Sequence, residues 1–342
     1  MPVRYVPILR WKRGERVGLQ HLSQNGKQRS TPLFLLGADQ YKIRPATKAR
    51  PAIPAPNVFA IDMAAAWGTA PFMLDAAAVP SAGSQHPLQQ IAASCSAAGL
   101  HMIPATYRGA PPPYQAAVNA AVQMGNGVCL RIDLQEATSI ANWIAQWPHP
   151  LNSTDLIIDF GGEVGTVANL GNALDHVFQH LHSGNMWRTV TIAGTSMPEN
   201  FTGYIAGLHV IQRREWMLWQ HLDGLGLPYA LGYGDFTATS PGAPPPGIAW
   251  GYPINVKYTL PAAFLICRGV GTTGPQGVDP GQQLTGHAAS IRGYQHRHPL
   301  ANIWADPVID LIATGGASPQ GLEHWVQLSV NRHIELVATL LP

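Results

Sequence analysis

Four aspartates stand directly after, or just beyond, short apolar runs of the chain: Asp62, Asp133, Asp159 and Asp235. If these runs are parallel strands, the carboxylates gather at the rim where the strands end. Several carboxylates at one rim could hold Mg²⁺ or Mn²⁺, or divide the roles of acid and base through unequal pKa values. Asp is also a favoured helix cap, so each aspartate alone is explained equally well by the helix or turn that follows it.

Cationic side chains occupy related positions. Arg10 and Lys12 follow the first apolar run two residues apart, and Arg131 precedes Asp133 by two. Residues two apart on a strand face the same side, so these side chains could point into one space. An Arg–Asp network filling a barrel end is the better interpretation for Arg131. We expect Arg10 and Lys12 to contact a phosphate or carboxylate ligand, for which cationic side chains are suited.

Other motifs in the sequence carry less chemistry. Residues 269–274 match the dinucleotide pattern G-x-G-x-x-G, but the Pro-rich residues 275–280 cannot open the helix that the pattern requires, which argues against NAD. His296 and His298 could bind Zn²⁺ only with further ligands, and no zinc-binding or EF-hand spacing occurs. The sequence therefore leaves the identity of any metal undetermined.

Eight apolar runs, mostly separated by stretches of helical spacing, are the elements that must position these groups. They span residues 6–9, 32–36, 58–61, 101–104, 128–132, 156–158, 190–192 and 229–231. Short apolar runs between turn signals are typical of strands buried on both faces of a parallel sheet. The pattern predicts an α/β fold, a single (β/α)8 TIM-type barrel over residues 1–342.

Two segments interrupt the barrel rhythm and are expected to be long loop excursions, at residues 37–57 and 236–300. Four prolines make a long helix over the first segment improbable. Within the second, residues 255–259 and 263–268 could pair as a hairpin or extend the last strand. Residues 320–341 have helical spacing and are expected to form the final helix of the barrel.

Composition excludes several classes of protein. The net charge is +2 and charged residues are 12% of the chain, which argues against tracking along a long nucleic-acid duplex. No apolar run is long enough to span a membrane or to form a signal peptide. The three cysteines are far apart, as expected for buried thiols in a reducing compartment. We therefore expect a soluble, cytoplasmic protein.

Three blocks of the sequence together resemble the phage and bacterial beta protein family, whose fold is TIM-barrel-like. They are Tyr5-x-Pro7-x-Leu9-Arg10-x-Lys12-x-Gly14-Glu15; Arg214-Glu215-Trp216-x-Leu218-Trp219 with Tyr233-Gly234-Asp235-Phe236; and Asn255-Val256-Lys257-Tyr258-Thr259 with Cys267-Arg268-Gly269. Their order and approximate spacing agree with the family over most of the chain. Lys257 stands where the family often has Arg, which weakens any role there that needs a bidentate guanidinium.

The resemblance implies a role in conflict between phage and host, because members occur in phages and in bacterial mobile or defence-associated regions. It carries over no catalytic residues. It does mark a set of positions to test: Arg10, Lys12, Glu15, Asp235, Lys257, Tyr258 and Arg268.

Two hypotheses of function follow. The first is a barrel that binds a small anionic ligand, a nucleic-acid end or another protein of a phage or defence system. The second is a phosphodiesterase or nuclease-like hydrolase in which the four aspartates hold a divalent metal or the attacking water. In it, Arg10, Lys12 and Arg268 would neutralise phosphate charge. The lack of a specific catalytic motif favours the binding barrel.

Overall fold

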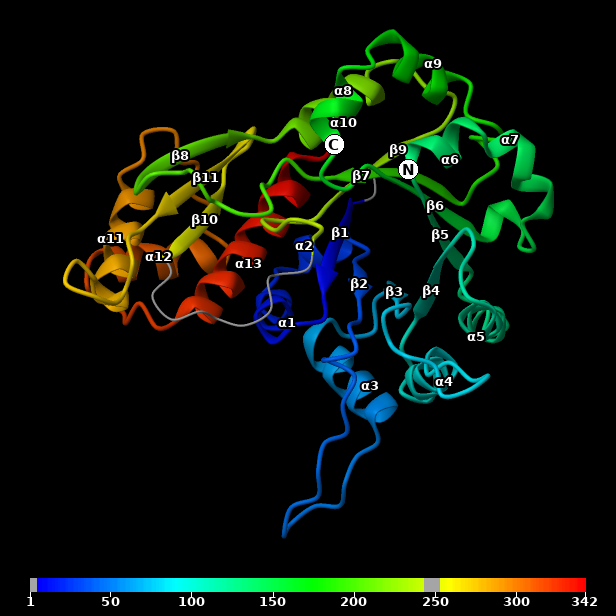
Figure 1. Ribbon diagram of the computed structural model, residues 1–342, viewed down its shortest axis with the longest axis horizontal. Helices are drawn as coiled ribbons and strands as arrows, with labels where there is room; N and C mark the ends of the chain where they lie inside the picture. Colours follow the sequence, from blue (N-terminus) through cyan, green and yellow to red (C-terminus); the bar gives the residue numbers. More distant parts are fainter. Residues whose placement is uncertain (1–4, 243–252) are drawn as a thin grey trace.

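Eight parallel strands close into a barrel in the computed structural model, which describes residues 5–242 and 253–342. The strands follow chain order around the ring, and the eighth, β9, pairs with both β7 and β1. They are β1 (Tyr5–Arg10), β2 (Leu33–Leu35), β3 (Phe72–Asp75), β4 (Met102–Tyr107), β5 (Val128–Ile132), β6 (Thr154–Asp159), β7 (Thr189–Gly194) and β9 (Leu231–Asp235). The predicted (β/α)8 barrel is confirmed (Figure 1).

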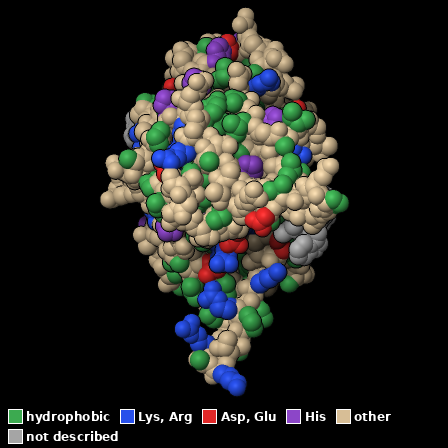
Figure 2. All heavy atoms as spheres, turned by 90° about the vertical axis from the view of Figure 1, so that its left-hand side faces the viewer, with side chains coloured by type: hydrophobic (Ala, Val, Ile, Leu, Met, Phe, Trp, Pro, Cys, Tyr) green, Lys and Arg blue, Asp and Glu red, His purple; other side chains and the backbone are tan. Residues whose placement is uncertain are grey.

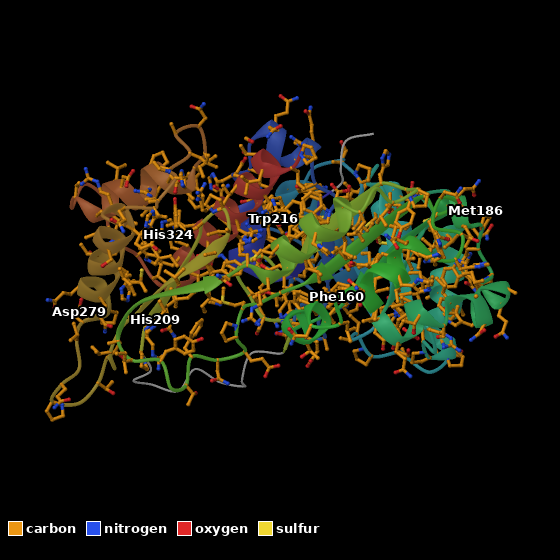
Figure 3. All side chains as sticks on the ribbon, turned by 90° about the horizontal axis from the view of Figure 1, so that it is seen from above. Phe160, Met186, His209, Trp216, Asp279 and His324 are labelled. Carbon is orange, nitrogen blue, oxygen red and sulfur yellow. The ribbon has the colours of Figure 1, made fainter. Side chains whose placement is uncertain are left out.

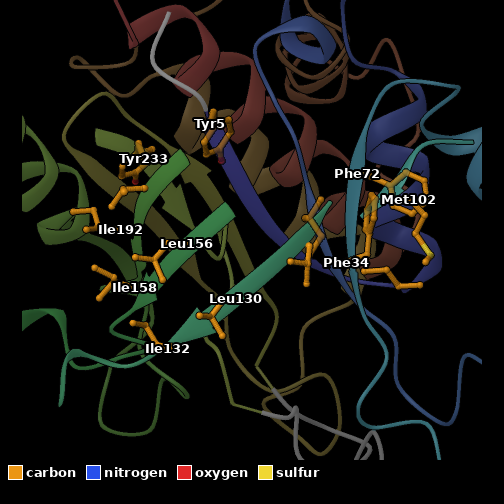
Figure 4. Close-up of a cluster of buried hydrophobic side chains, with 14 of the residues drawn as sticks. Tyr5, Phe34, Phe72, Met102, Leu130, Ile132, Leu156, Ile158, Ile192 and Tyr233 are labelled. Carbon is orange, nitrogen blue, oxygen red and sulfur yellow. The ribbon is translucent and has the colours of Figure 1, made fainter. Parts of the chain in front are cut away.

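Residues along each strand alternate between the barrel interior and its outer surface. The interior cluster is small and apolar and includes Val6, Ile8, Met73 and Ile157. Outward residues form a larger cluster under the helices, in which Leu130, Leu156 and Ile158 are among the side chains drawn in Figure 4. Both faces of the sheet are therefore buried, which explains why the strands read as continuous apolar runs.

Helices cover the outside of the barrel. They are α1 (Arg13–Gln20), α2 (Gln24–Gln28), α3 (Ala55–Ala66), α4 (Leu88–Ala97), α5 (Pro112–Val122), α6 (Leu134–Thr138), α7 (Ile140–Trp143), α8 (Val164–Ala168), α9 (Asn172–Gln179) and α10 (Arg214–Asp223), with the 3-10 turns η1 (Ile144–Gln146) and η2 (Leu151–Ser153). Within the described ranges, no helix is both long and apolar enough to cross a membrane.

The last helix, α13 (Leu322–Leu340), packs along α1 and against β1 and closes the ring of helices. Gly18 of α1 makes this close packing possible, because a Cβ added there would lie 2.8 Å from the carbonyl oxygen of Gln327. The expectation that residues 320–341 form the final helix of the barrel is thus confirmed.

The prediction of the third strand at residues 58–61 was wrong. Residues 58–61 lie inside α3, and the third strand is β3, which the sequence pattern did not reveal. Pro56 at the second position of α3 suits the first helical turn, and the alanines at its end favour helix. A four-residue apolar run fits one helical turn as well as a strand, so local pattern could not separate the two.

The last barrel strand also begins later than predicted. Residues 229–231 overlap β9 only at Leu231, and the Gly-Tyr-Gly that follows the predicted run belongs to the strand. Gly234 faces the barrel interior where neighbouring strands are close: an added Cβ would lie 3.1 Å from both Ala193 Cβ and the Val6 carbonyl oxygen. Gly234 therefore allows β9 to pack closely against β7 and β1.

A second, antiparallel sheet lies beside the barrel. Its strands are β10 (Asn255–Thr259), β11 (Ala263–Arg268) and β8 (Gly207–Gln212), with β11 in the middle. One face packs on α11 (Pro280–Arg292), α12 (Ala305–Ala313) and α13, and the other on the loops that follow β7 and β9. Figure 3 shows this sheet, marked by His209, at one end of the molecule and Met186 at the other end. Trp216 lies between them.

The expectation of a loop over residues 236–300 is wrong where that segment forms regular structure. It contains β10, β11 and α11, and β10 and β11 form the antiparallel hairpin that was one of the two predicted arrangements. The part of this predicted loop at residues 243–252 lies outside the described residues. Alternation in β10 and β11 buries Val256, Tyr258, Leu265 and Cys267 against the helices, which stabilises the hairpin.

Residues 37–54 connect β2 to α3 as an arm that extends away from the barrel (Figure 1). Two antiparallel bridges, Arg44 with Ile53 and Thr47 with Arg50, join its two sides. The arm leaves the barrel at the end of β2, so its base lies at the rim formed by the strand ends.

Candidate anion-binding site

Four charged side chains point inward at the ends of barrel strands. They are Arg10 on β1, Asp75 on β3, Arg131 on β5 and Asp159 on β6, each in register with the interior residues two positions earlier. A cavity of about 500 Å³ opens at this rim. Its charged lining residues are Arg10, Lys12, Asp39, Asp75 and Arg131, and Leu35, Leu36, Gly37, Gln40, Ala77, Ala78 and Pro241 complete it. Its size suits a small ligand.

The Arg131 guanidinium is neutralised by two carboxylates. Its Nε lies 2.6 Å from Asp159 Oδ2, and its Nη1 lies 3.5 Å from Asp75 Oδ2. The guanidinium also lies over the ring of Phe236, 5.9 Å from its centroid. This geometry supports the interpretation of Arg131 as a structural pair and extends it to a second acid.

Arg10 and Lys12 lack such partners. In the described part of the chain neither has a carboxylate within 4.0 Å. Arg10 Nη2 instead donates to the carbonyl oxygens of Ser240, at 3.0 Å, and Pro241, at 3.2 Å. Carbonyl groups accept its hydrogen bonds but do not neutralise its charge. The electrostatic potential near Arg10 therefore favours an anion.

Lys257 adds a further cation close to Arg10. It extends from β10 towards the barrel, where its Nζ donates to the Ala238 carbonyl oxygen at 2.8 Å and lies over the Phe201 ring. Burial and the positive charge of Arg10 lower its pKa to about 8. The second sheet thus brings a cation to the loop that follows β9, a position that could not be inferred from the order of the strands alone.

Glu15 lies beneath these cations in the first turn of α1 and is 4% exposed. Burial raises its pKa to about 8, although Arg10 and Lys12 act in the opposite direction. Its Oε2 is buried without a hydrogen-bond partner in the described structure. At neutral pH the carboxyl is therefore mainly protonated, and it does not cancel the positive charge above it.

We expect Glu15→Gln to flatten the dependence of stability on pH. A carboxyl whose pKa is raised in the folded state contributes its full stabilisation at pH values below its ordinary pKa of 4.5. That contribution is lost as pH rises through about 8, the pKa in the folded state. The wild type should lose a few kcal/mol over this range relative to the variant, as measured by urea unfolding. Glu323→Gln, at an exposed site, is the control; equal slopes in all three proteins would contradict the assignment.

The sequence as a whole matches a family model described as "Beta protein" over residues 5–339. The chain belongs to the beta protein family. The resemblance of the three sequence blocks is thereby confirmed, since the match covers the barrel, the second sheet and nearly all of α13.

Comparison with other proteins adds no function to this family member. No curated protein matches the chain. Among solved structures, MurG of Acinetobacter baumannii is similar at 10% identity with a TM-score of 0.20, over 68% of this chain and 67% of that one. A likeness this weak supports no argument about fold or chemistry.

The four aspartates proposed as a catalytic set do not converge at the rim. Asp62 lies on α3 and forms ion pairs with Arg16 and Arg44, because the run before it is helix and not strand. Asp133 caps α6 and forms a capping box with Glu136, as its alternative interpretation predicts. Among the four, only Asp159 points into the rim.

Asp235 faces the opposite way, out of the barrel and into a buried polar cluster. Its carboxylate accepts hydrogen bonds from the Tyr5 and Tyr233 hydroxyls at 2.8 and 2.7 Å, and from His333 Nε2 at 2.7 Å. Arg213 Nη2 lies 3.5 Å away, and Asp235, Arg213 and His333 are all 0% exposed. We call these five residues the Asp235 cluster.

The Asp235 cluster fixes the protonation of its histidine. Asp235 can only accept, so His333 Nε2 carries a proton, and Nδ1 then accepts from the Thr259 hydroxyl at 3.0 Å. Burial lowers the pKa of His333, which keeps the ring neutral. The chain of bonds joins β9 of the barrel to α13 and to β10 of the second sheet.

Tyr258 and Arg268, also proposed as ligand contacts, lie away from the cavity. The Tyr258 hydroxyl donates to Asp306 Oδ1 at 2.8 Å inside the core of the second sheet. Arg268 donates to the Tyr204 carbonyl at 2.7 Å and to Asn255 Oδ1 at 3.2 Å. Both side chains tie the second sheet together.

Sequence reasoning missed two rim residues, Asp75 and Phe236. Asp75 ends the apolar run of β3, which is the same signal that singled out the other aspartates. It was overlooked because residues 58–61 were predicted to be the third strand. Phe236 directly follows Asp235, and strand alternation turns the ring inward when the acid faces outward.

Proposed function

We propose that this member of the beta protein family is a ligand-binding barrel that takes a small anion at the rim. The ligand carries phosphate or clustered carboxylate groups, and Arg10, Lys12 and Lys257 bind them. The observation behind the proposal is the contrast between Arg131, paired with two acids, and Arg10, whose hydrogen-bond partners among the described residues are carbonyl groups. Conflict between phage and host, the setting suggested by the family resemblance, is part of this proposal.

Inorganic pyrophosphate is the probe for this site. Arg10→Gln should weaken binding about 10- to 100-fold by calorimetric titration, because it removes charge-assisted hydrogen bonds to the anion. Lys12→Gln tests the same pocket without affecting the bonds of Arg10 to residues 240–242. Arg292→Gln, an exposed cation on α11, is the control. Absence of pyrophosphate binding to the folded wild type would reject the proposal.

Binding should also weaken as pH rises through about 8. Lys257 loses its positive charge there, and Glu15 becomes negative beneath the cavity. Titrations on either side of this pH, repeated with Glu15→Gln, separate the two contributions. An affinity that stays constant across the range would remove Lys257 and Glu15 from the site.

The proposed biological setting has its own test. The wild type and Arg10→Gln are expressed in a bacterial host, and the efficiency of plaque formation is compared for a panel of phages. A change in plaque count with the wild type and not with the variant supports a role that depends on the rim. Equal counts for both proteins and the empty host count against it.

The alternative of a metal-dependent hydrolase finds less support in the geometry. Among the described residues, no group of three or more His, Cys, Asp or Glu side chains is arranged to hold a metal ion. The rim acids Asp75 and Asp159 are occupied by Arg131.

A further inference from the structure

The arm at residues 37–54 carries a concentration of positive charge. Lys42, Arg44, Lys48 and Arg50 are all exposed. Asp39 is the one acid in the segment, whereas the whole chain has a net charge of only +2. Figure 2 shows Lys and Arg side chains spread down the narrow end of the molecule.

The arm is held in a defined direction. Arg44 and Ile53 exchange backbone hydrogen bonds of 3.0 and 2.9 Å, and Thr47 N donates to the Arg50 carbonyl at 2.9 Å. At its base, Arg44 Nη2 lies 2.8 Å from Asp62 Oδ1, and Asp62 also pairs with Arg16 of α1. The cations of the arm therefore stand in a fixed relation to α1.

Three adjoining hollows lead from the base of the arm to the rim cavity. The first, of about 320 Å³, is lined by Arg44, Arg13, Arg16 and Asp62. The second, of about 480 Å³, shares the last three of these and adds Lys12. The third is the rim cavity, which shares Lys12 with the second and contains Arg10. Neighbouring hollows share lining residues, so we describe them together as the cationic furrow. Asp39, Asp62 and Asp75 are the acids that line these three hollows along with the cations named above.

We propose that the cationic furrow and the arm bind one strand of nucleic acid through its phosphates, with a terminal phosphate in the rim cavity. The proposal rests on the anion site described above and specifies its ligand. A strand carries one negative charge at each nucleotide, so a line of cations matches it along its length. A duplex presents two strands and would need cations spread over a broader face.

An acidic protein is a poorer fit to the same surface. Protein interfaces are built around a buried core of apolar and aromatic side chains. Among residues 37–54, all of which the structure describes, Ile43 is the one exposed large apolar side chain, at 66%. The furrow is lined mainly by charged side chains, which favours a ligand recognised through its charge.

The test measures binding of a fluorescent single strand of about 12 nucleotides over a series of salt concentrations. The triple variant Lys42→Gln, Lys48→Gln, Arg50→Gln removes three charges from the arm and keeps the pair of Arg44 with Asp62. Its plot of log affinity against log salt should lose about 2 from the slope, at roughly 0.7 for each phosphate contact. The control Lys27→Gln, Arg214→Gln, Arg292→Gln removes three charges elsewhere and should keep the slope.

The terminal phosphate is tested with strands that carry a phosphate at the 5′ end, at the 3′ end or at neither. One phosphorylated strand should bind about tenfold more tightly than the strand without, and Arg10→Gln should abolish that preference. Equal slopes for the arm variant and its control, or equal binding of the three strands, would overturn the inference. So would equal or tighter binding of a blunt duplex or of a polyglutamate peptide. Pyrophosphate binding retained in any of these cases would show that the rim site stands without the strand.

Discussion

Asp235→Asn is expected to lower the free energy of unfolding by about 3–5 kcal/mol, the range for removing one partner of a buried ion pair. The substitution removes one of the two carboxylates beside Arg213, which is 0% exposed: Asp235 lies 3.5 Å and Glu215 3.6 Å from its guanidinium nitrogens. It also places an amide where Tyr5, Tyr233 and His333 all donate to the carboxylate. Urea unfolding followed by tryptophan fluorescence measures the loss.

The same residue predicts how the wild type responds to acid. Burial acts to raise the pKa of Asp235, but His333, Arg213 and the Tyr233 hydroxyl outweigh it and hold the pKa at about 2, below the ordinary 3.8. A carboxylate with a lowered pKa stabilises the fold above its ordinary value, and that contribution disappears as pH falls through about 2. Asp235→Asn should therefore be less sensitive to acid than the wild type.

Asp133→Asn is the matched control, because Asn caps a helix as well as Asp does and the site is exposed. It should change stability by less than about 0.5 kcal/mol. If Asp235→Asn were as stable as this control, the Asp235 cluster would not hold the barrel to the second sheet.

Asp306→Asn is expected to have the second large effect, again about 3–5 kcal/mol. Asp306 is 1% exposed, and Arg332 and Arg297, which are 0% and 5% exposed, approach its carboxylate at 3.5 and 3.4 Å. Leu300 N also donates to it at 2.6 Å. Loss of the charge would leave two buried guanidinium groups competing for fewer acceptors.

This second effect should be local to the outer sheet. Asp306 lies on α12, and its partners lie on β10, on α13 and in the segment after α11. Hydrogen exchange in α11 and α12 should accelerate while exchange in β5 and β6 stays slow. Asp310→Asn, which contacts the same Arg297 but is 39% exposed, is the control. Uniform acceleration across the chain would indicate that the two cores unfold together.

The motif residues that carry the family resemblance divide between two places in the fold. Tyr5, Tyr233 and Asp235 belong to the buried Asp235 cluster. From the same blocks, Arg10 lines the rim cavity and Lys257 donates a hydrogen bond to the loop that follows β9. Motif positions therefore occur both in a buried polar cluster and near the rim, and only contacts in the structure separate the two groups.

The sequence by itself determined the barrel and the final helix. Buried parallel strands must be apolar on both faces, so six of the eight runs coincided with barrel strands, and a seventh overlapped β9 at one residue. Alternation along the strands was also sufficient to predict that Arg10 and Arg131 face the barrel interior, where both line the rim cavity. Local propensity failed at residues 58–61, where four apolar residues suited a helical turn equally well.

The tertiary structure alone decided which charged groups meet. Asp159 and Asp235 both end barrel strands, yet one pairs with Arg131 in the rim and the other is buried outside it, because their strands end in opposite phase of the alternation. Lys257 reaches Arg10 from a strand about 250 residues away, through a sheet whose position depends on packing. Distances across a fold are set by how its elements pack, and a pattern along the chain contains no record of them.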